Sequence, residues 1–188
     1  MITEGTIVKN ELHDRIREIE QEHNIKFSNT QKVLLSIEGS ISAILDVLYC
    51  TVSIFIVKQN FKKADSEKSK LLNIDEDDEI YEREALIHGR GRPMIYSSSY
   101  IPVKRCRKQA QEDLNRGKIS IGRILKKYDI ESRREIKSIY IEKPNATLKE
   151  LFNTSEDFIS REYLIIENSE ILMWTKESFP VSYFSKEI

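Results

Sequence analysis

The stretch IYEREALIHGRGRPMIYSSSYIP, residues 80–102, decides the fold class of this chain. Apolar and polar residues alternate from Ile80 to His88, which is typical of a strand with one buried face. Pro93 to Ile101 forms a second strand that ends at Pro102. Gly89-Arg90-Gly91 between them suits a tight turn, because glycine adopts a positive φ without steric cost. The stretch therefore predicts a β-hairpin.

Helices and one strand are expected before this hairpin. Apolar residues at helical spacing, with capping residues ahead of the second and third segments, predict helices from Asn10 to about Asn24, through Val33–Ile37, and from Ile41 to about Leu48. β-branched and aromatic residues predict a strand from Thr51 to Gln59. The charged segments 62–70 and 75–79 are expected to be solvated loops.

Short helices alternate with strands after the hairpin. Helices are expected at Lys104–Arg116, Ile121–Tyr128 and Leu148–Phe152, and strands at Ile136–Ile141, Glu162–Glu167 and Ile171–Thr175, the last two flanking a turn at Asn168-Ser169. An α+β fold follows, with a single antiparallel sheet of about six strands and helices packed on it. We expect one domain over residues 1–188, in which residues 1–27 are an N-terminal helical extension.

The composition disfavours several classes of protein. Lysine and arginine number 30 and aspartate and glutamate 31, so the net charge of −1 disfavours a globally basic nucleic-acid binder. No apolar run approaches the ~20 residues of a membrane helix. No basic patch followed by an apolar stretch marks a secretory signal, so we expect a cytoplasmic protein with reduced cysteines. Cys50, Cys106 and the three histidines have no metal-ligand spacing, and no metal is expected.

Two charged residues are predicted to lie on otherwise apolar strand faces. Alternation places Arg83 with Ala85 and Ile87, and Glu177 with Thr175. A buried charge is costly unless it is paired or bound to a ligand. The two residues therefore indicate an internal salt bridge, a misassigned register with both groups exposed, or a pocket with polar ends. In such a pocket Arg83 would bind a carboxylate, and Glu177 would be a hydrogen-bond partner or proton acceptor.

Four short motifs follow one another in the chain: EGSIS at 38–42, RE at 83–84 followed by GRP at 91–93, GKISIGR at 117–123, and ESFP at 177–180. In this order and spacing they resemble the chorismate-pyruvate lyase family, particularly its archaeal branch, and more distantly the UTRA-type sensing domains of GntR-like regulators. The resemblance covers about Ser28 to Pro180. It implies that Ile41 lines the pocket, Arg83 binds a carboxylate, the backbone at Ile121 contacts that carboxylate, and Glu177 supplies the essential acid.

One position departs from the family pattern. Bacterial lyases place a second arginine late in the hairpin strand, on the pyruvyl side of the pocket, and Ser98 falls at that position. A neutral hydroxyl cannot replace a fixed positive charge. Either another base holds the enolpyruvyl carboxylate, with Arg134 and Arg92 the leading candidates, or the ligand is different. A solvated surface role is equally open for Arg134.

The resemblance implies a reaction that needs no cofactor or metal. Chorismate would lose pyruvate and leave aromatic 4-hydroxybenzoate, while the protein positions the substrate, excludes water and stabilises the departing enolpyruvate. The proton at C4 would pass to Glu177 or move within the substrate. The alternative is a non-catalytic domain that binds a small aromatic acid, and Ser98 favours it. In either case the expected partner is a small molecule, with no nucleic acid or membrane, and exposed edge strands would allow a homodimer.

Overall fold

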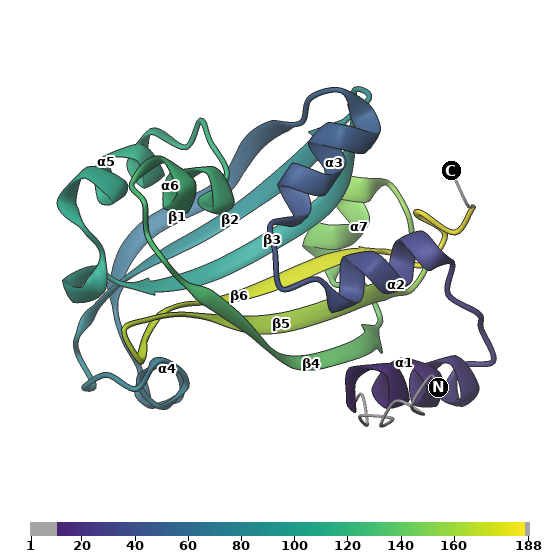
Figure 1. Ribbon diagram of the computed structural model, residues 1–188, viewed down its shortest axis with the longest axis horizontal. Coiled ribbons are helices and arrows are strands. Elements are labelled where there is room, and N and C mark those ends of the chain that lie inside the picture. The colour runs from purple at the N-terminus through teal and green to yellow at the C-terminus, as the bar shows by residue number, and fades with distance from the viewer. Residues whose placement is uncertain (1–10, 187–188) are drawn as a thin grey trace, which may run out of the picture.

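The computed structural model describes residues 11–186, and these form a six-stranded antiparallel sheet with helices on both faces (Figure 1). The strand order is β1-β2-β3-β6-β5-β4. The strands are β1 Ser53–Lys63, β2 Glu79–Gly89, β3 Arg92–Pro102, β4 Arg133–Glu142, β5 Phe158–Glu167 and β6 Glu170–Pro180. The predicted α+β class and single antiparallel sheet are confirmed. Residues 1–10, the first part of the expected N-terminal extension, lie outside the described residues.

The helices divide between the two faces of the sheet. They are α1 Glu11–Glu22, α2 Asn29–Ser36, α3 Ile41–Tyr49, α4 Ser66–Leu72, α5 Lys108–Arg116, α6 Ile121–Lys127 and α7 Ala146–Phe152, with a 3₁₀ turn at Val103–Arg105. Apolar residues of α1, α2 and α3 form one cluster on the sheet, and those of α5 and α6 form a second cluster on the same face. Helices α4 and α7 pack against the opposite face. No helix within residues 11–186 has the length and apolar character needed to cross a bilayer.

The hairpin of residues 80–102 has the predicted topology with a shorter turn. Gly89 still belongs to β2, and the turn consists of Arg90 and Gly91 alone, with φ of 53° and 75°. Two consecutive positive φ angles match the right-handed twist of the flanking strands. Arg83 pairs with Ser99 across the hairpin, so odd-numbered residues of both strands share one face of the sheet.

Several sequence-based boundaries are wrong, and β6 runs to Pro180, five residues past its expected end at Thr175. The segment 62–70, expected to be a loop, contains the end of β1 and most of α4, because Asp65 caps this helix (Lys68 N to Oδ1, 2.9 Å) and Leu72 is fully buried. The expected helix 104–116 begins only at Lys108, after the 3₁₀ turn. Strand β5 starts at Phe158, four residues before the expected position.

Candidate functional site

A band of polar residues crosses the middle of the sheet on the face that α3 and α6 cover. On this face, each of β3, β5 and β6 has two successive polar residues with an apolar residue on either side. Strand β2 contributes Arg83. The band consists of Arg83, Ser97, Ser99, Arg161, Tyr163, Thr175 and Glu177. It separates the cluster under α1, α2 and α3 from the cluster under α5 and α6. The interior on this side of the sheet is therefore interrupted by a pocket with a polar floor.

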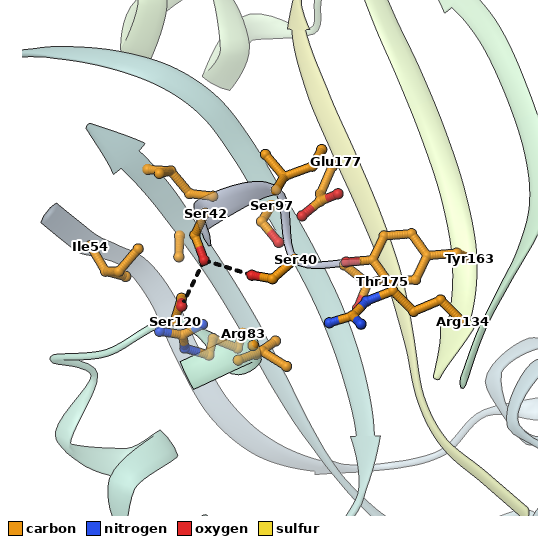
Figure 2. A pocket seen from close by; sticks show the side chains of 15 residues that line it. Ser40, Ser42, Ile54, Arg83, Ser97, Ser120, Arg134, Tyr163, Thr175 and Glu177 are labelled. Carbon is orange, nitrogen blue, oxygen red and sulfur yellow. Dashed lines mark hydrogen bonds between the residues drawn. The ribbon is translucent and has the colours of Figure 1, made fainter. Parts of the chain in front are cut away.

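The roof of the pocket is formed by the first residues of two helices (Figure 2). Ser42 Oγ at the start of α3 donates to Ser120 Oγ, the N-cap of α6, at 2.9 Å, and Ser40 Oγ lies 2.9 Å from Ser42 Oγ. A Cβ added at Gly122 would lie 2.4 Å from Ser40 Oγ, so only glycine allows this approach. The free volume inside is about 30 Å³, enough for ~2 water molecules.

Arg83 extends from β2 into this pocket and is only 3% exposed. Its Nη2 donates to the carbonyl of Ile119 at 3.2 Å, while its buried Nε has no hydrogen-bond partner. Within residues 11–186 no carboxylate lies within ion-pairing distance of Arg83, and burial lowers the pKa of its guanidinium. A buried cation without an anionic partner is costly unless a ligand supplies the negative charge.

Glu177 extends from β6 into the same pocket and is 6% exposed (Figure 2). Its carboxylate is held by Arg161 of the neighbouring strand β5, whose Nε and Nη2 lie 2.9 Å and 2.8 Å from Oε2. Both contacts fall on Oε2 and leave Oε1 to the pocket. Arg161 therefore gives the buried Glu177 carboxylate a counter-charge in the interior.

The side of the pocket opposite Arg83 consists of Arg134 and Tyr163 (Figure 2). Arg134 Nη1 donates to the carbonyl of Glu38 at 3.3 Å, and its buried Nε has no partner. Burial raises the pKa of Tyr163, and the charge of Glu177 raises it further. The Tyr163 hydroxyl therefore stays protonated at neutral pH and can donate a hydrogen bond to a ligand.

The structure gathers most of the candidate residues around this one pocket. Arg83, Glu177, Ile41, Ile121 and Arg134 all line it. This arrangement decides among the alternatives that the sequence left open for the two charged residues. Neither is exposed, and they do not pair with each other. The internal salt bridge exists for Glu177 alone, with Arg161 as its partner.

Two other candidates lie elsewhere. Ser98 lines a groove on the opposite face of the sheet, so its prediction as a residue of this pocket is wrong. Strand alternation gives the reason, since Ser97 is the serine that pairs with Glu177 and lines the pocket. Arg92 is exposed at the end of the hairpin, where its guanidinium lies 4.9 Å from the centre of the Tyr183 ring.

Sequence reasoning missed Arg161 and Tyr163. Both are odd-numbered positions of β5, on the pocket face beside Glu177. The expected strand began at Glu162, which left Arg161 outside it. The signal that could have found them is the alternation Ile159, Arg161, Tyr163, Ile165, which matches the pattern of β3 and β6.

No group of three or more His, Cys, Asp or Glu side chains within residues 11–186 could hold a metal ion.

Solved structures with this arrangement of strands and helices are transcriptional regulators and their effector domains. PhnF from Mycobacterium smegmatis superposes with a TM-score of 0.64 at 12% identity, covering 92% of this chain and 89% of PhnF. The separate effector domain of PhnF gives 0.63 at 12% identity, covering 78% and 90%. A GntR-family regulator from Bacillus cereus gives 0.56 at 17% identity, covering 73% and 96%. The chain thus has the effector-domain fold of GntR-family regulators.

Sequence similarity narrows this class to one family. The family model described as chorismate pyruvate-lyase, Rv2949c-like, matches residues 35–186. The chain belongs to this family, which confirms the resemblance drawn from the four motifs. It is also 29% identical over 159 residues, 81% of this chain and 79% of the relative, to a Methanocaldococcus jannaschii protein named "Putative lyase MJ0807".

Proposed function

We propose that this protein eliminates pyruvate from chorismate and releases 4-hydroxybenzoate. The observation that carries the proposal is the buried Arg83, which has no anionic partner within residues 11–186 and shares an enclosed pocket with the anion Glu177. Such a pocket suits a ligand with a carboxylate at one end and a hydrogen-bond donor near the other charge. The family and the relative named a lyase support the reaction class.

Chorismate carries two carboxylates, and the pocket offers a cation for each. Arg83 and the backbone N–H of Ile121 hold the ring carboxylate, and Ile41 packs against the ring. Arg134 and the Tyr163 hydroxyl hold the enolpyruvyl carboxylate. Arg134 thereby takes the role that the family pattern would have given to an arginine at the position of Ser98. The buried, unpartnered Nε of both arginines supports this assignment.

Glu177 performs the proton transfer in this proposal. Its Oε1 lies near C4 of the substrate and accepts the C4 proton as the bond from C3 to the ether oxygen breaks. The ring becomes aromatic, and the enolpyruvate takes up one proton at its methylene carbon to become pyruvate. One proton is lost and one is gained. Aromatisation supplies the driving force, and Arg134 stabilises the negative charge that develops on the leaving group.

The roof must open for the substrate to bind. A free volume of about 30 Å³ is far too small for chorismate, and the Ser42–Ser120 hydrogen bond closes the gap between α3 and α6. Opening separates these two helix starts, and closing them over the substrate excludes water from the elimination.

Incubation of the purified protein with chorismate, followed by proton NMR, tests the proposal. Pyruvate and 4-hydroxybenzoate should appear together in equal amounts, and Glu177→Gln should abolish both. Glu84→Gln is the matched control, because Glu84 faces the groove on the other side of the sheet.

The same sample run by size exclusion with light scattering would test for a homodimer. Cell fractionation would test the expected cytoplasmic location.

The second candidate function is a non-catalytic domain that binds a small aromatic acid. Its support is the fold, since the structural neighbours described above are regulators and their effector domains. In that case the protein would bind 4-hydroxybenzoate in calorimetry but would leave chorismate unchanged beyond the uncatalysed rate. Product formation that depends on Glu177 would eliminate this candidate.

A further inference from the structure

Arg161 on β5 is the largest of the fully buried side chains among residues 11–186. It is 1% exposed and does not line the cavity, so a ligand held there does not touch it. Its polar contacts are Nε and Nη2 to Glu177 Oε2 and Nη1 to the carbonyl of Ile37 at 2.9 Å, and its guanidinium lies 5.0 Å from the centre of the Tyr163 ring. A guanidinium this deep in a sheet is expensive to desolvate, and an apolar side chain would serve packing better.

Its contacts join the floor of the pocket to the roof. Ile37 is the C-cap of α2 and lies three residues before Ser40, where α3 begins to close the pocket. The guanidinium is planar and rigid, so its contacts to Glu177 and to Ile37 fix one another's geometry. Any shift of the loop between α2 and α3 is therefore transmitted to the Glu177 carboxylate.

We infer that Arg161 is the positioning residue of this site: it directs Glu177 Oε1 into the pocket and couples that orientation to the loop that carries the roof. The inference deepens the proposed function and depends on it for the role of Glu177. Other charged or titratable groups face the pocket as well: Arg83 from β2, Arg134 from β4 and Tyr163 from β5. Only Arg161 contacts Glu177 within ion-pairing distance among the described residues.

Arg161→Lys and Arg161→Gln test this role. Lysine keeps the charge but, without the planar guanidinium, cannot contact Glu177 Oε2 and the Ile37 carbonyl in the same geometry, and glutamine removes the charge. With chorismate as substrate, kcat should fall about tenfold or more in Arg161→Lys while KM changes less than about threefold, because the substrate does not touch Arg161. In Arg161→Gln kcat should fall further at an equally small change in KM, since the charge is lost together with the contacts.

Lys176→Gln is the matched control. Lys176 pairs with Glu142 at 2.7 Å on the opposite face of the sheet, so its loss removes an ion pair without reaching the pocket. This variant should keep the wild-type kcat and KM. A wild-type kcat in both Arg161 variants would overturn the inference. A fall in kcat that comes with an equal rise in KM would do the same, because it would show a merely structural role.

A second readout separates this inference from the proposed function. If the wild-type protein does not convert chorismate, the proposed reaction fails, and titration with 4-hydroxybenzoate by calorimetry still tests Arg161. Because a misplaced Glu177 carboxylate loses its hydrogen bond to the ligand, the affinity should fall about tenfold in Arg161→Gln and stay at the wild-type value in Lys176→Gln. Equal affinities in wild type and Arg161→Gln would refute the role of Arg161 irrespective of turnover.

Discussion

Replacing Arg83 by methionine should make the protein more stable and weaken the binding of its ligand. Methionine is flexible and of similar length, so it can fill the space along β2 without a charge. The buried guanidinium has one hydrogen bond, to Ile119 O, and an unpartnered Nε. Its desolvation penalty of several kcal/mol is therefore largely uncompensated in the ligand-free protein.

The size of both effects follows from this environment. Loss of the hydrogen bond lowers the free energy of unfolding by about 1 kcal/mol. Removal of the buried charge raises it by more than that, because the desolvation penalty of the guanidinium disappears. The free energy of unfolding should therefore rise by about 1–2 kcal/mol. For a chain of this length the melting temperature should rise by about 2–8 °C. Hydrogen bonds to a charged group contribute about 1.5–3 kcal/mol, so the affinity for 4-hydroxybenzoate should fall about 10- to 150-fold.

Arg161→Met provides the contrast. Arg161 is equally buried on the same face but is paired with Glu177, so its loss leaves an uncompensated carboxylate and should cost about 3–5 kcal/mol of stability. Urea unfolding and calorimetric titration measure both quantities for both variants. If Arg83→Met proved less stable than wild type by more than about 1 kcal/mol and still bound the ligand normally, Arg83 would be a structural residue and the site assignment would be wrong.

Three further predictions concern the base, the roof and the opposite face. Glu177→Gln should abolish pyruvate release in a coupled assay yet remain folded by circular dichroism, and residual turnover near the wild-type rate would exclude Glu177 as the base. Gly122→Ala should force the roof apart and speed product release in stopped-flow fluorescence, and adding Ser40→Gly should restore the wild-type rate, because the added Cβ would otherwise lie 2.4 Å from Ser40 Oγ. Burial alone would raise the pKa of Glu82, but the ammonium groups of Lys62 and Lys58 outweigh it and hold the pKa below its usual value. This stabilisation is present above the unfolded-state pKa of about 4.3 and is lost as pH falls through the lower folded value. When the free energy of unfolding is measured in urea at several pH values, Glu82→Gln should therefore lose less stability than wild type below about pH 4.

The hairpin shows how much of the site the sequence could predict. Alternation alone placed Arg83 on the interior face, because its neighbours on that face are apolar and the turn at Arg90-Gly91 fixed the register. The same rule, applied to the partner strand, excludes Ser98 from that face. The motif alignment placed Ser98 in the pocket because a linear alignment carries no information about which face a residue occupies.

The partner of Arg161 is what the sequence could not predict. A strand segment with Ser160, Arg161 and Glu162 in succession has the composition of a surface loop. It is buried because Arg161 meets Glu177 on the adjacent strand and Ser160 meets Ser178, and both pairings depend on the register of β5 against β6. Local propensity does not report such long-range compensation. For the same reason α4 went unrecognised, since its stability comes from Leu72 in the core.

The polar band has a consequence for how this fold diversifies. Most of the apolar burial that holds the sheet to its helices lies in the two clusters on either side of the band. Outside the Arg161–Glu177 pair and Tyr163, exchanges within the band can therefore change which molecule is bound at little cost to the stability of the fold.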